Sequence, residues 1–179
     1  QPGSVFITRL DVVVAHQPGR AGRVGGRVGD QYLNYTWAFK DGEWQKLAPM
    51  TEPNPRYFSA MASGSNKTYL YGGALVDSVF DDLWEWDGMD WQHGTATNSL
   101  PRAGHSMVVE DAFLRILGGT QEALSLPGNI NVVADCGVLQ SEWLSRPCPD
   151  VPRVFGSAAM FTNDAVWAGG WPVGHAPQR

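Results

Sequence analysis

The sequence predicts an all-β chain built from repeated units of short antiparallel strands. Eight Trp, seven Phe and five Tyr are interleaved with 21 Gly and 12 Pro, and aromatic residues between turn-forming residues indicate many short strands. Apolar and polar residues alternate with a period of two, which is a strand signal and not a helix signal. Gly-Gly doublets recur along the chain at intervals of 47, 46 and 51 residues. A repeat of about this length indicates a propeller or a solenoid.

Size and charge exclude several classes of function. The chain has 179 residues, of which 43% are hydrophobic, so it is long enough for one domain with a substantial core. The formal net charge is -5, and the acidic residues are scattered along the chain. Neither a nucleic-acid surface nor a surface for anionic membranes is indicated. The longest apolar stretches fall far short of the roughly 18 residues that a membrane span requires.

Three markers recur in phase. The doublets are Gly25-Gly26, Gly72-Gly73, Gly118-Gly119 and Gly169-Gly170. Pro-Arg dipeptides occur at Pro55-Arg56, Pro101-Arg102 and Pro152-Arg153, each Pro 17 residues before the next doublet. A Trp follows the doublet in three units, as Trp44, Trp91 and Trp143. Three independent markers with a common phase indicate a true structural repeat.

The strands of the second and third units follow from alternation and turn residues. We expect first strands at residues 58–62 and 105–109, second strands at 68–71 and 113–117, a third strand at 83–87, and a short fourth strand that begins at Trp91. Asp41-Gly42 and Asp87-Gly88 precede the first two repeated Trp residues, and Asp-Gly between strands is a strong hairpin signal.

Four antiparallel strands make one blade of a propeller. The chain divides into a degenerate first blade at residues 8–54, a second at 55–100, a third at 101–151, and the first half of a fourth at 152–179. Residues 1–7 are a candidate outer strand of a preceding blade. The expected fold is therefore a partial ring of about three and a half blades, treated as one domain.

These markers resemble the kelch family, whose repeats carry a Gly doublet at the end of the second strand and an aromatic residue on the fourth. The segments most similar to kelch repeats are 101–105, 83–88 and 117–119. The first unit departs from the pattern, because Thr8-Arg9 stands where Pro-Arg is expected. The resemblance implies an interaction module that uses the loops between second and third strands and between successive blades.

Most repeated residues are expected to be structural. The doublets Gly72-Gly73, Gly118-Gly119 and Gly169-Gly170 suit strand ends where another backbone approaches closely. Trp44, Trp91 and Trp143 are expected to be buried between blades. The recurrence of an Arg in each blade indicates packing or hydrogen bonding between blades, and His105 is expected to be a hydrogen-bonded blade residue.

The loop ends of the blades supply the candidate partner-binding residues. These are Arg56, Tyr57, Phe58, Asp81, Arg102, His105, Arg153 and Phe155. Propellers close with about 4 to 8 blades, and an incomplete ring leaves two sheet faces without neighbours. We therefore expect the chain to contact a second copy, another protein or further blades.

No catalytic, metal or cofactor motif is visible in the sequence. The four His are 12 or more residues apart, and neither Cys belongs to a Cys-x-x-Cys motif. Asp81-Asp82 is interpreted as a solvated loop, with a carboxylate pair as the alternative. The expected function is a non-catalytic protein-binding or structural scaffold without a cofactor. The alternatives are a carbohydrate-binding propeller, with Trp171 or Phe155 as a stacking face, and part of an enzyme similar to galactose oxidase.

Cysteine usage and the first residues bear on the compartment. The chain starts at Gln1 without a positively charged stretch before an apolar run, as expected of the mature part of an exported protein. Cys136 and Cys148 can close a short loop in an oxidising compartment, and the alternative is two buried thiols. Sequons at Asn34 and Asn66 permit glycosylation. An extracellular or cell-surface location is expected, with the cytoplasm as the alternative.

Overall fold

The structure is a computed structural model that describes residues 13–17, 20–111, 113–122, 136–139, 141–148, 153–161 and 164–172. It is all-β, and the described residues form antiparallel sheets without a helix. Accordingly, no helix in the described ranges has the length and apolar character of a membrane span. The expected all-β fold class is confirmed, including the absence of a helix between Arg56 and Gly119.

Three four-stranded sheets and one strand pair contain most of the strands, each in chain order. Sheet 1 consists of β1 (Val13–Gln17), β2 (Arg20–Val24), β5 (Thr36–Lys40) and β6 (Glu43–Lys46). Sheet 2 consists of β7 (Ala60–Ser63), β8 (Thr68–Tyr71), β9 (Leu83–Trp86) and β10 (Trp91–His93). Sheet 3 consists of β11 (Ser106–Glu110), β12 (Phe113–Leu117), β13 (Cys136–Leu139) and β14 (Trp143–Arg146). Sheet 4 is the pair β15 (Arg153–Phe161) and β16 (Asp164–Pro172).

A short hairpin of β3 (Arg27–Val28) and β4 (Gln31–Tyr32) is inserted between β2 and β5 of sheet 1. No repeated marker in the sequence predicts this hairpin. The expected second strands at 68–71 and 113–117 agree with β8 and β12. The first strands begin one or two residues later than expected, since Phe58 and Gly104 have positive φ angles of 56° and 65°. A left-handed residue interrupts extended backbone, so the strand starts beyond it.

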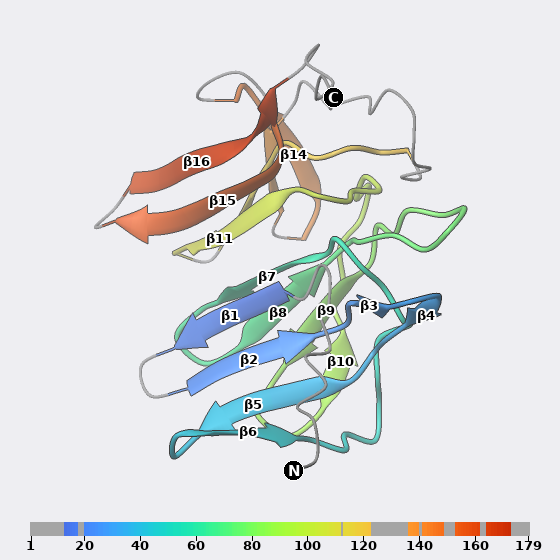
Figure 1. Cartoon of the computed structure of the whole chain (residues 1–179). Coiled ribbons are helices and arrows are strands. Elements are labelled where there is room, and N and C mark those ends of the chain that lie inside the picture. The colour runs from blue at the N-terminus through green and yellow to red at the C-terminus, as the bar shows by residue number, and fades with distance from the viewer. Residues whose placement is uncertain are drawn as a thin grey trace.

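The first strands of the sheets contact one another in succession. β1 contacts β7, β7 contacts β11, and β11 contacts β15. Figure 1 shows β1 beside β7 and β11 beside β15, and it shows β2, β5 and β6 following β1 in order across sheet 1. Each sheet is therefore joined to the next through its first strand.

Two apolar clusters fill the spaces between the four-stranded sheets. Between sheets 1 and 2, Val24 packs with Leu70 and Trp91. Between sheets 2 and 3, Tyr71 and Leu83 pack with Ile116. All six side chains are almost fully buried. The core thus lies in layers between neighbouring sheets.

The expected burial of Trp44 is wrong. Trp91 is 2% exposed, but Trp44, which follows the doublet of sheet 1 at the same spacing, is 38% exposed. Trp91 faces sheet 1, where its indole Nε1 donates a hydrogen bond to Thr36 Oγ1. Trp44 lies on the opposite face of sheet 1, away from sheet 2. Its exposure follows from this orientation, because sheet 2 covers only the opposite face.

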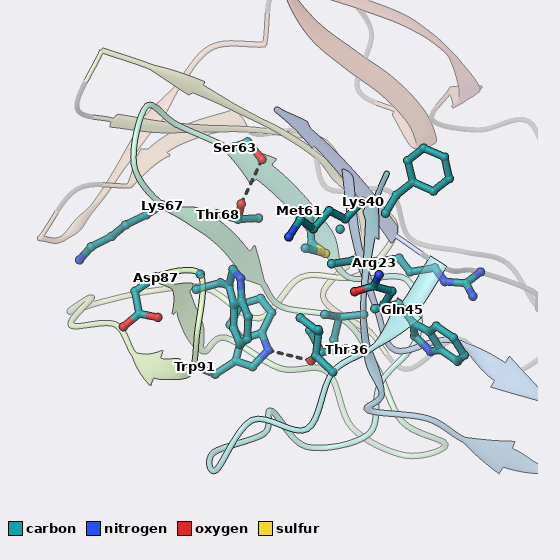
Figure 2. A pocket seen from close by; sticks show the side chains of 18 of the residues that line it. Arg23, Thr36, Lys40, Gln45, Met61, Ser63, Lys67, Thr68, Asp87 and Trp91 are labelled. Carbon is teal, nitrogen blue, oxygen red and sulfur yellow. Dashed lines mark hydrogen bonds between the residues drawn. The ribbon is translucent and has the colours of Figure 1, made fainter. Parts of the chain in front are cut away.

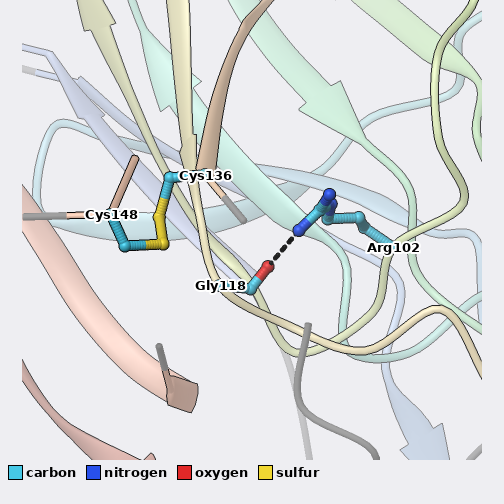
Figure 3. The surroundings of a disulfide bond; sticks show 4 residues. All are labelled: Arg102, Gly118, Cys136 and Cys148. Atoms are coloured by element: carbon cyan, nitrogen blue, oxygen red, sulfur yellow. Dashed lines mark hydrogen bonds between the residues drawn. A yellow bond between two sulfur atoms is a disulfide. The ribbon is translucent and has the colours of Figure 1, made fainter. Parts of the chain in front are cut away.

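The turns and the cysteines agree with the sequence. Asp41, Gly42, Asp87 and Gly88 are all exposed, so both Asp-Gly turns lie at the surface as expected. The structure joins Cys136 and Cys148 in a disulfide with a Cα separation of 4.9 Å (Figure 3). Cys136 is the first residue of β13, so the bond ties the segment that follows β14 back to sheet 3.

Candidate functional site

Arg56 is buried at the joint between sheets 1 and 2. Its guanidinium donates to the backbone carbonyl of Gly72 at 2.8 Å and forms two hydrogen bonds with the carboxylate of Asp82 at 2.6 and 2.7 Å. Its own carbonyl accepts a hydrogen bond from the backbone N–H of Gly26 in the preceding sheet. One residue therefore links the doublets of two successive sheets.

Asp82 supplies the counter-charge for this arginine. Burial alone raises the pKa of its carboxyl. The hydrogen bonds and positive charge of Arg56, with a hydrogen bond from Trp84 Nε1, outweigh this effect, so the pKa lies below its usual value. The side chain of Arg56 is 0% exposed and that of Asp82 is 17% exposed. Removing one partner of a buried ion pair is strongly destabilising, because it leaves the other charge buried without a counter-charge.

Arg102 repeats the arrangement at the next joint. Its guanidinium donates to the carbonyl of Gly118 at 2.9 Å (Figure 3). Its own carbonyl accepts a hydrogen bond from the backbone N–H of Gly73. The guanidinium also lies 4.8 Å from the ring centroid of Trp143. Arg56 and Arg102 are both fully buried, so their side chains hold the sheets together and present no surface to a partner.

His105 is buried beside the second of these joints. Its ring lies edge-on to Tyr71 at a centroid distance of 5.5 Å, and within the described part of the chain neither ring nitrogen has a hydrogen-bond partner. Burial, with a smaller effect from the charge of Arg102, lowers the pKa of the imidazole to about 3. The ring is therefore neutral in the folded protein near neutral pH.

Four aromatic side chains contact one another in a continuous row, which we call the aromatic row. It consists of Tyr32, Tyr57, Phe58 and Phe155, with successive ring centroids 5.3, 4.6 and 4.6 Å apart. Tyr57 is buried, and the other three rings are half-buried. The row brings together three of the predicted binding residues, Tyr57, Phe58 and Phe155, and adds Tyr32, which the sequence reasoning missed.

The backbone beneath the aromatic row is left-handed at three equivalent positions. Phe58, Gly104 and Phe155 each lie two residues after the repeated Arg, with φ angles of 56°, 65° and 58°. Hydrogen bonds connect them, from Gly104 N to the Phe58 carbonyl at 2.8 Å and from Phe155 N to the Gly104 carbonyl at 2.7 Å. A positive φ at a non-Gly residue costs about 1 to 3 kcal/mol, and such strain concentrates at functional sites.

A groove of about 370 Å³ lies between sheets 1 and 2, away from the aromatic row (Figure 2). Sheet 1 contributes Lys40 and Gln45, and sheet 2 with its turns contributes Asn66, Lys67 and Asp87. Trp86 and Trp91 line its apolar part. A volume of this size suits a small ligand, and a mixture of aromatic and polar groups is typical of small-molecule sites.

Charged groups at the groove are held in their ionised forms. A hydrogen bond to the Glu85 carboxylate at 2.5 Å, together with its negative charge, raises the pKa of the Lys67 ammonium. Backbone N–H groups of Asp90 and Met89 donate to the carboxylate of Asp87 and lower its pKa. The groove therefore offers both a positive and a negative group near neutral pH. Its lining comes from the facing surfaces of two repeats, and no local sequence pattern marks it.

The remaining predicted site residues are placed as follows. Asp81 is exposed, whereas Asp82 is engaged with Arg56, so the two neighbouring carboxylates do not act as a pair. Arg153 is the first residue of β15, and its side chain and that of Trp171 lie outside the described residues. In the ranges that the structure describes, no three His, Cys, Asp or Glu side chains gather in a way that could hold a metal ion.

No protein-family model matches the chain, and no curated protein matches it.

Proposed function

We propose that the chain is part of a kelch-type β-propeller that acts as a non-catalytic scaffold, a protein-binding or structural subunit completed by further blades or by another chain. The observation that carries this proposal is the succession of contacts from β1 to β7, β11 and β15. Each of these strands is the first of an antiparallel meander. First strands side by side, with the other strands extending outward, are the arrangement of blades around a propeller axis.

The buried arginines support a structural scaffold. Arg56 and Arg102 connect one Gly doublet to the next by the same pair of hydrogen bonds. Because the repeated polar residues are used to join the sheets, they fix how successive loops lie relative to one another. Loops that a rigid scaffold holds in fixed positions are suited to binding a partner protein.

The aromatic row is the surface where we place the partner. Tyr32 of β4, Phe58 in the segment before β7 and Phe155 of β15 are half-buried rings. Val76, 56% exposed, lies in the turn beside them, since Ala74 pairs with both Tyr57 and Val79. Aromatic residues are enriched among the residues that dominate protein interfaces. The Cys136–Cys148 disulfide supports an extracellular or cell-surface location, because disulfides persist in oxidising compartments.

The groove between sheets 1 and 2 favours carbohydrate binding as a second candidate function. Its lining includes the side chains of Trp86, Gln45 and Asn66. An apolar ring face beside amide donors and acceptors can bind the apolar and hydroxyl faces of a sugar. This site is distinct in position and residues from the aromatic row.

Panning of a random-peptide display library against the purified chain tests the first proposal. Peptides selected by the native chain should lose at least tenfold in affinity with Tyr32→Ser or Val76→Lys. The matched control Met50→Ser changes a residue that is 95% exposed and should leave binding unchanged. Failure to select any peptide, combined with glycan-array binding that Asn66→Ala and Gln45→Ala abolish, would favour the carbohydrate function instead. A stoichiometric metal in the purified protein would favour a propeller enzyme.

A further inference from the structure

The groove between sheets 1 and 2 has an equivalent at the next joint, between sheets 2 and 3. Gly22 and Tyr69 each stand three residues before a Gly doublet, on the second strands β2 and β8. Residues two apart on a strand share a face, so Gly22 lies on the face of Val24 and Tyr69 on the face of Tyr71. Val24 packs against sheet 2, and Tyr71 packs against sheet 3. Gly22 and Tyr69 therefore occupy the same place at successive joints.

Tyr69 fills this place at the joint between sheets 2 and 3. Its half-buried side chain packs against the apolar cluster that the two sheets share. The residues of sheet 3 at this cluster are all apolar, namely Met107, Val109, Leu114, Ile116, Leu139 and Trp143. An aromatic ring of one sheet thus packs against an apolar wall of the next.

Gly22 brings no side chain to the same place between sheets 1 and 2, and it lines the groove of about 370 Å³. The strands of sheet 2 contribute five more lining residues to the groove, Met61, Ser63, Thr68, Trp86 and Trp91. Counted from the Gly doublets through the strand register, their equivalents in sheet 3 are, in the same order, Met107, Val109, Leu114, Leu139 and Trp143. The groove is therefore a joint of the same design without the ring that Tyr69 supplies.

Two of the five positions are polar in the groove and apolar at the next joint. Ser63 stands in the place of Val109, and Thr68 in the place of Leu114. The two hydroxyls form one hydrogen bond, with Ser63 Oγ and Thr68 Oγ1 3.1 Å apart (Figure 2). Each hydroxyl has one donor and two acceptor positions, so the pair can form further hydrogen bonds. The groove thus combines room for a ring with groups that bind hydroxyls.

Trp86 and Trp91 supply the apolar surface of the groove. Their ring centroids are 5.3 Å apart, and Trp86 is half-buried. The Nε1 atom of Trp91 is engaged with Thr36 Oγ1, so this indole offers only apolar surface (Figure 2). A pyranose ring has an apolar C–H face and hydroxyls around its edge, and it matches both kinds of surface. A purely aromatic ring would leave the hydroxyls of Ser63 and Thr68 unused.

Charged side chains of both signs line the groove. Lys40 and Lys67 are positive and Asp87 is negative. The ammonium of Lys67 is engaged in the ion pair described above. The Arg23 guanidinium lies 4.6 Å from the ring centroid of Trp44, on the other face of sheet 1. Neither sign is in clear excess, so the lining favours a neutral ligand.

We propose that the groove binds one neutral pyranose ring in the place that Tyr69 takes at the next joint, and that Gly22 is the residue that makes room for it. The inference rests on the second candidate function, carbohydrate binding, and it names the ligand class and the residue that determines it. It requires only the packing of sheet 1 on sheet 2 and uses no residue of the aromatic row.

Titration of the purified chain with the methyl pyranosides of glucose, galactose, mannose and N-acetylglucosamine tests this proposal. Tryptophan fluorescence reports binding because Trp86 lines the groove, and isothermal titration calorimetry confirms it. At least one of these sugars should bind. Methyl glucuronide, which carries a negative charge, and p-cresol, which has an aromatic ring without sugar hydroxyls, should each bind at least tenfold more weakly.

Gly22→Tyr should fill the groove. The φ angle of Gly22 is not positive, and an added Cβ would meet its nearest neighbour, the Trp37 carbonyl oxygen, at 3.7 Å, so the position accepts a side chain. The variant should raise the midpoint of thermal unfolding and weaken sugar binding at least tenfold. Gly22→Ala is the matched control, because it adds only a methyl group and should keep the affinity within about twofold.

A second variant tests the hydroxyls and keeps the experiment decisive if Gly22→Tyr does not fold. Ser63→Val combined with Thr68→Leu introduces the side chains that sheet 3 has at these positions. Sugar binding should fall at least tenfold, with circular dichroism unchanged. Ser65→Val, at an exposed residue of the same turn, is the matched control and should leave binding unchanged.

Three outcomes overturn the proposal. None of the four neutral sugars binds, or p-cresol or methyl glucuronide binds more tightly than all of them, or both groove-filling and hydroxyl variants bind sugar as the native chain does. If larger glycans on an array still bind and Asn66→Ala abolishes their binding, the carbohydrate function stands and only the single-ring site is rejected. If no glycan binds at all, the carbohydrate function fails as well. Peptide binding through the aromatic row is independent of all these results.

Discussion

The indole of Trp91 donates a hydrogen bond from Nε1 to Thr36 Oγ1 at 2.9 Å across the joint between sheets 2 and 1. Both residues are buried, at 2% and 4% exposure. The bond joins residues 55 positions apart and satisfies the only polar atom of the indole side chain. It shows that the repeated Trp of one sheet is held by the sheet before it.

Replacement of Trp91 by Ala should lower the free energy of unfolding by about 3 to 5 kcal/mol, because it opens a cavity among Val24 and Leu70. Trp91→Phe keeps part of the ring, so its cost should be smaller. Urea unfolding followed by circular dichroism measures both. Met89→Ala, at a residue 84% exposed, is the control and should stay within about 0.5 kcal/mol. A loss below about 1 kcal/mol for Trp91→Ala would show that this joint contributes little to stability.

Asp82→Asn should lower the free energy of unfolding by about 3 to 5 kcal/mol at pH 7, since it leaves the buried Arg56 without its counter-charge. The pKa of Asp82 is lowered on folding, so its contribution is present above the unfolded pKa of about 4 and is lost as the pH falls through the folded pKa. The difference between native chain and variant should therefore shrink below about pH 4 in urea titrations. An equal difference at pH 3 and pH 7 contradicts this account. Asp81→Asn, at the exposed neighbouring residue, is the matched control.

His105 should make stability fall as the solution is acidified from about pH 6.5. Its pKa of about 3 in the folded protein lies below the ordinary value of 6.5, so the unfolded chain binds a proton that the folded chain excludes. The contribution is fully present above pH 6.5 and is lost as the pH falls toward 3, with a slope of up to about 1.4 kcal/mol per pH unit. His105→Asn should remove this slope in unfolding curves between pH 4 and 7. His93→Asn, at an exposed residue, is the control and should leave the slope unchanged. If His105→Asn also leaves the slope unchanged, His105 is not the group that causes it.

Gly104→Ala should be more destabilising than Gly29→Ala. Both glycines have positive φ angles, 65° and 57°, so an added Cβ strains the backbone at both, by about 1 to 2 kcal/mol. At Gly104 the Cβ also meets the Phe155 ring at 2.8 Å, whereas at Gly29 it meets nothing within 4 Å. The additional loss measured by thermal unfolding should be about 1 to 3 kcal/mol. Equal losses would mean that the Phe155 ring moves aside without cost.

The sequence by itself determined the repeat and much of the strand pattern. Gly doublets, turn residues and alternation are local signals, and β8 and β12 appear with the bounds that these signals predict. Both Asp-Gly turns lie at the surface, as their sequence predicts. A tight turn is also a local signal, because it requires only the residues that form it. The recurrence of Arg at one position also indicated a role in joining repeats.

Only the tertiary structure decided which repeated residues are buried and which groups meet. Trp44 and Trp91 carry the same local signal, but a neighbouring sheet covers Trp91 alone, and burial depends on that neighbour and not on the residue. The same holds for Tyr32, which enters the aromatic row from an inserted hairpin, and for the groove formed between Gln45 and Asn66. These sites combine side chains from different sheets, and no periodicity within one repeat encodes the distance between two repeats.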